Sequence, residues 1–193
     1  EVLRDLGREE EAGQSLEAAV GLNPEHRDAW FLLGLVREVT GELEAALAAF
    51  TRCVELDDRH ADGHYHRGLT LVALGRPEEA VEAFDQALDI DPSRPDAWFQ
   101  EGLVLEQFGE YDRAVPALET SLSLDPNQAE AWLPIARIRS AQGRPRDAVA
   151  ACGQVIRIDP RHSPALTLKG LSEEAIGERE HALQSLWKSL GID

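Results

Sequence analysis

The sequence contains no methionine, only 6% aromatic residues and only two cysteines among 193 residues. The two cysteines stand 99 residues apart, so they form no disulfide framework and a reducing compartment, the cytoplasm, is the expected location. No run of apolar residues approaches the roughly 18 that a membrane helix needs, so we predict no membrane span. Because the first residue is Glu, an upstream targeting segment remains an open alternative.

Basic side chains are also scarce. There are 19 Lys and Arg against 36 Asp and Glu, which gives a formal net charge of -17. Because binding to nucleic-acid phosphates needs a surplus of basic residues, this balance predicts no nucleic-acid partner. The sequence also lacks a Gly-rich phosphate loop, a serine elbow and a Cys–His pair at catalytic spacing. We therefore predict no enzymatic activity and no cofactor.

An internal repeat of 34 residues is the main feature that is present. One glycine series keeps this step without a slip, and an alanine series follows it five residues later. The glycines are Gly7, Gly41, Gly75, Gly109, Gly143 and Gly177, and the alanines are Ala12, Ala46, Ala80, Ala114, Ala148 and Ala182. The period divides the chain into a partial unit 1–26, four complete units 27–60, 61–94, 95–128 and 129–162, and a last unit 163–193.

Each unit shows helical apolar spacing twice. In residues 27–60, one stripe precedes Gly41 and a second follows it. A glycine between two helices suits a turn that needs a left-handed backbone, and Pro77 and Pro145 fall where the second helix of their units should begin. Because single helix pairs cannot bury their apolar faces, neighbouring pairs must stack. The sequence predicts an all-α solenoid of stacked antiparallel helix pairs.

The repeated residues resemble the tetratricopeptide repeat family. The pattern is carried by Trp30, Leu33, Gly34, Ala46, Phe50 and Cys53, and again by Gly68, Ala80, Phe84, Ala87 and Pro92. The resemblance implies a single array over residues 1–193 that forms a right-handed superhelix. Some units depart from the pattern: Arg67, Glu101 and Lys169 replace a buried Leu, and Pro116 and Pro134 lie inside expected helices. We expect these departures to cost local helix stability.

Two groups of reactive side chains were weighed as sites. His60, Asp62, His64 and His66 could supply metal ligands, but His64 occupies the packing place of Trp30 and His66 points elsewhere around the helix. We therefore predict packing and surface histidines, with no metal. Cys53 and Cys152 fall on inward-packing places of second helices, so we predict two buried thiols.

The resemblance implies that the first helix of each unit lines a concave groove that binds the partner. One apolar row there consists of Phe31, Tyr65, Phe99 and Leu133, and a row one turn later consists of Leu35, Leu69, Leu103 and Arg137. An acidic residue borders each unit: Asp28, Asp62, Asp96 and Glu130. These rows favour a protein or peptide partner with apolar anchors and basic flanks. The alternative is that the aromatic residues only pack neighbouring repeats together.

Charge is unevenly spread along the repeats. Residues 129–162 hold six arginines and three acidic residues, whereas every other unit has an acidic surplus. The arginines, of which Arg137 lies in the predicted groove, are either scattered surface charge or a docking site for an acidic partner or a second copy of the chain.

Three functional hypotheses follow from these patterns. The first is a protein-interaction scaffold that holds a peptide or helix of a partner in the groove. The second is a structural array that forms homo-oligomers through its ends or through residues 129–162. The third is a regulatory arm of a larger enzyme.

Overall fold

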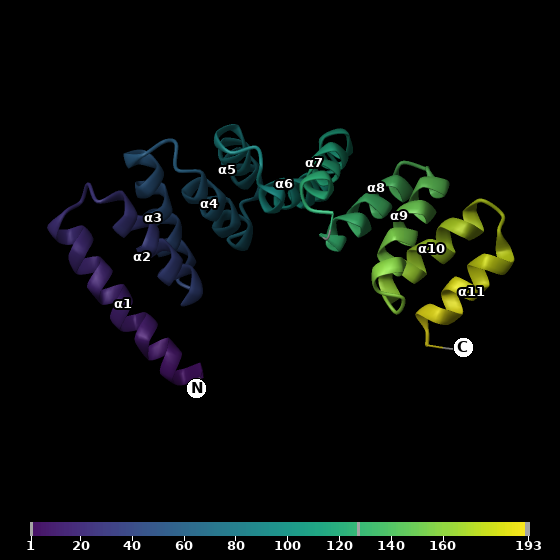
Figure 1. Cartoon of the computed structure of the whole chain (residues 1–193), viewed down its shortest axis with the longest axis horizontal. Coiled ribbons are helices and arrows are strands. Elements are labelled where there is room, and N and C mark those ends of the chain that lie inside the picture. Colours follow the sequence, from purple (N-terminus) through teal and green to yellow (C-terminus); the bar gives the residue numbers. More distant parts are fainter. Residues whose placement is uncertain (1, 127, 192–193) are drawn as a thin grey trace. The chain divides into compact units, whose positions relative to one another are not determined.

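The computed structural model describes residues 2–126 and 128–191 and contains only helices within them. The α-helices are α1 Val2–Leu22, α2 Arg27–Val39, α3 Leu43–Leu56, α4 Ala61–Ala73, α5 Pro77–Ile90, α6 Pro95–Phe108, α7 Tyr111–Leu124, α8 Trp132–Ala141, α9 Pro145–Ile158, α10 Ser163–Ala175 and α11 Arg179–Ser189 (Figure 1). A short 3-10 helix, Ala129–Ala131, precedes α8. The predicted all-α fold is confirmed.

The helices pack as sequential antiparallel pairs within two compact units, residues 1–104 and 105–193. In the first unit, α2 pairs with α3 and α4 pairs with α5, while α2 also packs on α1 and α4 on α3. In the second unit, α8 pairs with α9 and α10 with α11, and α10 packs on α9. Each of the first helices α2, α4 and α10 therefore contacts the second helix of its own repeat and the second helix of the preceding repeat. The single continuous array over 1–193 stays a prediction.

The periodic glycines form the predicted turns, with one exception. Gly41, Gly75, Gly109, Gly143 and Gly177 all have φ between 68° and 86°, a backbone conformation that side chains with a Cβ rarely adopt. Gly7 instead lies inside α1, which runs without a break from Val2 to Leu22. The turn that the repeat period predicts at Gly7 is therefore wrong. A single glycine inside a helix costs only about 1 kcal/mol, so the helix can continue through it.

A second glycine series, which includes Gly34 and Gly68, lets the paired helices approach closely. A Cβ on Gly34 would stand 2.5 Å from the ring of Phe50, and a Cβ on Gly68 would stand 2.5 Å from the ring of Phe84. Both rings are fully buried. The ring of the second helix thus occupies the space that the missing side chain leaves.

Pro116 and Pro134 were both expected to weaken their helices, but only Pro116 removes a helical hydrogen bond. Pro134 lies in the first turn of α8, where backbone N–H groups have no partner inside the helix, so its missing N–H costs no helical hydrogen bond. Pro116 lies inside α7 and does remove one. Pro77 and Pro145 stand at the start of α5 and α9, as predicted.

Lys169, which replaces a core Leu, is compensated by polar neighbours. Its Nζ lies 2.6 Å from Oε1 of Glu173 and 3.3 Å from Oγ of Ser185, and the Ser185 hydroxyl donates to Oε2 of Glu173 at 2.7 Å. Glu173 and Ser185 are buried. The half-buried Lys169 ammonium is therefore paired with the buried Glu173 carboxylate, which removes most of the penalty that an isolated buried carboxylate would carry.

Candidate functional site: the first-helix surface

We call the side chains that the first helices present at the predicted groove places the first-helix surface. Its apolar members are half-buried: Phe31, Leu35, Tyr65, Leu69, Phe99, Leu103 and Leu133. Each keeps some surface for a partner while contacting the protein. Among the charged residues at the predicted places, Asp28, Asp62, Glu130 and Arg137 are exposed, and Asp96 is half-buried.

Phe31 lies within a cluster of rings that joins two repeats. Its centroid is 4.8 Å from that of His60, 5.7 Å from that of His66 and 5.9 Å from that of Phe50. His66 belongs to α4, the first helix of the next repeat, and its ring stacks on Phe50 at 5.5 Å. Phe31 therefore contributes to packing between repeats, with only part of its ring free to bind a ligand.

Tyr65 occupies the same place one repeat later and is covered by Arg94. The Arg94 guanidinium carbon lies 4.7 Å from the Tyr65 ring centroid, a distance suited to a cation–π contact. Burial, with the Asp96 carboxylate nearby, raises the pKa of Tyr65 to about 12. Arg94 and His60 stand 34 residues apart in the sequence, so the residue before the next first helix covers the aromatic ring in both repeats.

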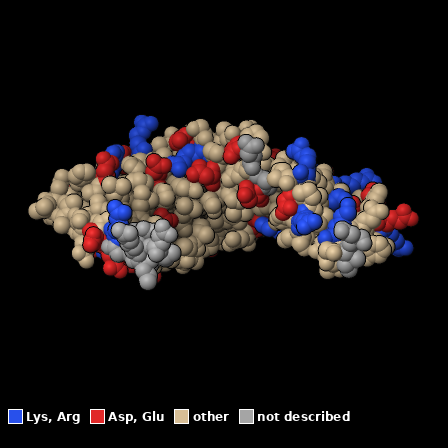
Figure 2. Space-filling view, turned by 60° about the horizontal axis from the view of Figure 1, so that its bottom comes forward, with Lys and Arg blue, Asp and Glu red and all other residues tan. Residues whose placement is uncertain are grey.

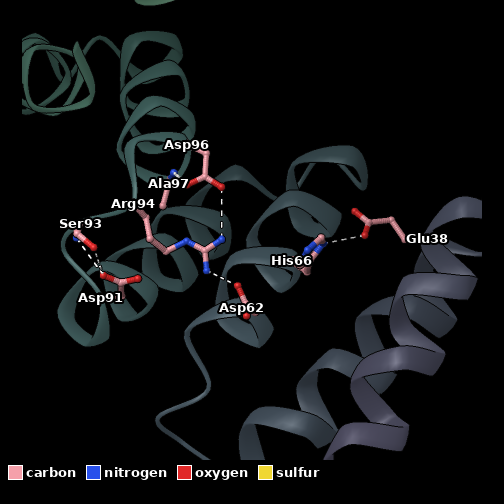
Figure 3. Close-up of polar contacts among 8 residues, drawn as sticks. All are labelled: Glu38, Asp62, His66, Asp91, Ser93, Arg94, Asp96 and Ala97. Carbon is pink, nitrogen blue, oxygen red and sulfur yellow. Dashed lines mark hydrogen bonds and ion pairs between the residues drawn. The ribbon is translucent and has the colours of Figure 1, made fainter. Parts of the chain in front are cut away.

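The acidic border is largely paired with arginines, and the arginine that pairs with Asp96 comes from the preceding repeat. Arg94 forms ion pairs with Asp62 and with Asp96, the latter at 3.3 Å, and Figure 3 shows its guanidinium between the two carboxylates. His66 Nδ1 lies 3.0 Å from Oε2 of Glu38, and the same figure draws this contact. Asp28 accepts from Arg27 Nε at 2.8 Å. Asp28, Asp62 and Asp96 therefore do not form a row of unpaired negative charge.

Arg137, the basic member of the predicted surface, is also paired. Its Nε and terminal nitrogen each lie 2.6 Å from a carboxylate oxygen of Glu106, a bidentate arrangement. This contact joins α8 to α6 and raises the pKa of Arg137. The one arginine at a predicted groove place therefore already has an acidic partner inside the protein.

The other arginines of residues 129–162 divide into two sets. Arg139 pairs with Glu119 at 3.3 Å and Arg144 with Asp147 at 2.6 Å. Arg146, Arg157 and Arg161 are exposed and have no carboxylate partner among the residues that the structure describes. Figure 2 shows that, on the face in view, basic and acidic side chains stand close together rather than as a uniform acidic coat.

The four candidate metal ligands have separate partners. His60 Nδ1 accepts the Gly63 N–H at 2.8 Å and caps α4, while His64 Nε2 lies 3.0 Å from the Asp58 carbonyl oxygen. Asp62 and His66 are held by Arg94 and Glu38. His64 repeats the contact of Trp30, whose Nε1 donates to the Pro24 carbonyl at 2.9 Å. Burial lowers the pKa of His64.

Sequence reasoning missed the residues of the links between repeats. His26, His60 and His162 each accept a backbone N–H three residues on and cap the following first helix. Arg94 holds the same place in its repeat but covers Tyr65 instead. These four positions are separated by 34 residues or a multiple of 34, and this register was the available signal.

Comparison with known proteins identifies the family. Models described as tetratricopeptide repeat match residues 1–61, 41–95, 65–129 and 105–171. Because these matches cover most of the sequence, the chain belongs to the tetratricopeptide repeat family. A comparison with curated proteins gives no significant match.

Solved structures of two proteins of this family show the same fold. YrrB, described as a tetratricopeptide repeat protein with an unusual peptide-binding site, is 26% identical, with a TM-score of 0.85 over 94% of this chain and 93% of YrrB. A MamA structure is 23% identical, with a TM-score of 0.80 over 82% of this chain and 93% of that one. MamA from Desulfovibrio magneticus RS-1 is 20% identical over 86% and 94%, also at 0.80.

Within the described residues, no helix has both the length and the hydropathy that crossing a bilayer requires. This agrees with the absence of a long apolar run in the sequence.

Proposed function

We propose that this protein is a non-catalytic interaction scaffold that binds a peptide or helical segment of a partner on the first-helix surface. The main support for this proposal is a row of half-buried leucines that recurs once per repeat: Leu35, Leu69 and Leu103. Tetratricopeptide repeats generally serve as protein-interaction scaffolds. The peptide-binding site described for YrrB, which shares the fold at 26% identity, supports the proposal.

The ion pairs that the acidic border residues form bear on which kind of partner can bind. Because Asp62 and Asp96 hold Arg94, and Asp28 holds Arg27, a basic flank on the partner must compete with arginines already in place. Ion pairs at exposed positions each contribute roughly 0–1 kcal/mol, whereas a fully buried Leu contributes about 1.5–3 kcal/mol. We therefore assign most of the affinity to the leucines and expect basic flanks mainly to set the association rate.

The leucines, rather than the aromatic residues, give the cleaner test. Phe31 packs against His66 of the next repeat and Tyr65 packs against Arg94, so their alanine variants would change the fold as well as the surface. The combined variant Leu35→Gln, Leu69→Gln and Leu103→Gln should retain the helical circular-dichroism spectrum and lose binding to a partner captured with the intact protein. Leu22→Gln with Leu124→Gln, two exposed leucines elsewhere, is the matched control. Unchanged binding by the triple variant would refute the proposed surface.

A second candidate function rests on Arg146, Arg157 and Arg161. These exposed arginines suit an acidic partner or an acidic region of a second copy, which keeps homo-oligomer formation through residues 129–162 as the alternative. Replacing all three with Gln should abolish any self-association that weakens with salt. Sedimentation velocity at low and high ionic strength would measure it.

A further inference from the structure

A groove of about 550 Å³ lies beside Trp30, where the second helices α1 and α3 flank the first helix α2. Apolar residues of all three helices line it: Val20, Gly21, Trp30, Leu33, Ala45 and Ala48. Gly21, Ala45 and Ala48 are exposed, and Trp30 is half-buried. A ligand can therefore reach the groove, which we call the Trp30 groove, from solvent.

The repeat 61–94 fills the corresponding place with charged side chains. Its counterparts of Leu33, Ala45 and Ala48 are all charged: Arg67, Glu79 and Glu82. The Arg67 guanidinium donates to Oε1 of Gln86 on α5 at 3.2 Å, so this side chain lies along the second helix of its repeat. The Trp30 groove is therefore a property of particular residues in repeat 27–60 and not of the repeat fold.

A second hollow of about 320 Å³ adjoins the Trp30 groove, and the two share Glu17, Arg37 and Glu42. A glycine makes room for it, because Gly13 stands where the other repeats have an apolar side chain: Leu47, Val81, Val115, Val149 and Leu183. A Cβ on Gly13 would lie 3.5 Å from Val36, an ordinary contact, so packing does not require a glycine here.

The second hollow is acidic. Its described lining residues include three carboxylates, Glu10, Glu17 and Glu42, and one basic residue, Arg37. Arg37 forms ion pairs with Glu17 and with Glu42, while Glu10 is exposed. Because one guanidinium does not balance three carboxylates, this hollow attracts a further cation.

We propose that the two adjoining hollows bind a partner polypeptide through two of its side chains. An aromatic or aliphatic anchor would lie beside Trp30, where it removes apolar surface of Ala45 and Ala48 from water. A Lys or Arg would lie beside Glu10 and offset the excess of negative charge. The hollows lie between α1 and α3, outside the first-helix surface, so this inference does not depend on the proposed function.

The test uses three capped peptides as probes: acetyl-Phe-Gly-Lys amide, acetyl-Ala-Gly-Lys amide and acetyl-Phe-Gly-Glu amide. In NMR titrations of the isotope-labelled intact protein, the first peptide should shift the amide signals of Gly21 and Ala48 and the indole signal of Trp30. The alanine peptide and the glutamate peptide should each bind at least about threefold more weakly, because each lacks one of the two side chains.

Two protein variants test the anchor. Ala45→Glu combined with Ala48→Glu restores the acidic residues of repeat 61–94 at exposed helical positions, so this double variant should bind the Phe and Ala peptides equally. Ala150→Glu, at an exposed alanine that holds the place of Ala48 in repeat 129–162, is the matched control. It should leave the preference for the Phe peptide unchanged.

A second pair of variants tests the cation. Glu10→Gln should weaken the preference for the lysine peptide over the glutamate peptide, because it removes one carboxylate from the second hollow. Glu11→Gln, at the neighbouring exposed residue, is the matched control and should keep that preference.

Three results would overturn the proposal: no signal changes with acetyl-Phe-Gly-Lys amide, changes confined to the leucines of the first-helix surface, or preferences that survive the double variant and Glu10→Gln. Gly21 and Ala48 signals that move with protein concentration in the absence of peptide would also overturn it, by making a second copy the occupant. The triple leucine variant of the first-helix surface should bind acetyl-Phe-Gly-Lys amide normally, which separates this test from that of the proposed function.

Discussion

The repeats at 27–60 and 61–94 build the same contacts with different side chains. Trp30 in the first donates to a carbonyl six residues earlier, and His64 in the second contacts the corresponding carbonyl. His60 covers Phe31 in the first, and Arg94 covers Tyr65 in the second. In both, a glycine on the first helix receives a Phe ring from the second. The comparison teaches that backbone positions fix the shape of each contact, while several side-chain chemistries can supply it.

The largest expected effect comes from substituting the first-helix glycine that both repeats share. Gly34→Ala and Gly68→Ala each place a methyl group 2.5 Å from a buried ring, so each should lower the free energy of unfolding by about 1–3 kcal/mol. Gly153→Ala is the matched control, because this glycine lies within α9 with nothing near a new Cβ. It should stabilise by about 0.5–1 kcal/mol. Urea unfolding measures all three, and equal effects at the three sites would contradict the packing argument.

The next prediction concerns pH dependence, because His64 can take up a proton and Trp30, at the same place in the other repeat, cannot. Burial lowers the pKa of His64 in the folded protein, so the unfolded chain takes up a proton first as the pH falls. This contribution makes the free energy of unfolding decrease as the pH falls below about 6.5. His64→Trp should remove that part of the pH dependence and add about 1 kcal/mol at neutral pH.

Urea unfolding at pH 7.5 and pH 5.5 provides the measurement for His64. His181→Gln, at an exposed histidine, is the control for replacing a histidine that is not buried. A wild-type pH dependence that survives His64→Trp would show that burial at this place is not its cause.

A smaller effect separates His60 from Arg94. Arg94→Gln removes two ion pairs and the cation–π contact with Tyr65, so it should cost about 1 kcal/mol at low salt and less at high salt. His60→Gln should show no comparable salt dependence. Thermal unfolding of both variants at 20 mM and 500 mM NaCl, roughly 20 and 4 Å of Debye screening, distinguishes them.

The smallest expected effect concerns the two thiols. Burial raises the pKa of Cys53 and of Cys152 to about 11, so both should react slowly with a thiol reagent at pH 8 in the folded protein. Both should react at once in 6 M urea. Rapid modification of either thiol without urea would mean that its repeat opens readily.

The periodic part of the fold could be predicted from the sequence, whereas contacts between repeats could not. The helices and turns could be predicted because residues such as Gly41 and Pro77 determine the conformation of the backbone around them, and they recur at a fixed period. The course of α1 through Gly7 was missed because a turn also needs a helix to pack back against. Pairs such as His66 with Glu38 and Arg137 with Glu106 join neighbouring repeats and lie 28 and 31 residues apart in the sequence. Spacing alone does not show which of several nearby charges a side chain reaches.

We propose that the first helices form the partner-binding surface. Hydrogen exchange of the complex tests this most directly. With a partner captured by the intact protein, amide exchange should slow in the repeats' first helices, around Leu35 in α2 and Leu69 in α4. The second helices α3 and α5 should change little. Protection that is confined to α3 and α5, with none in α2 and α4, would contradict the account.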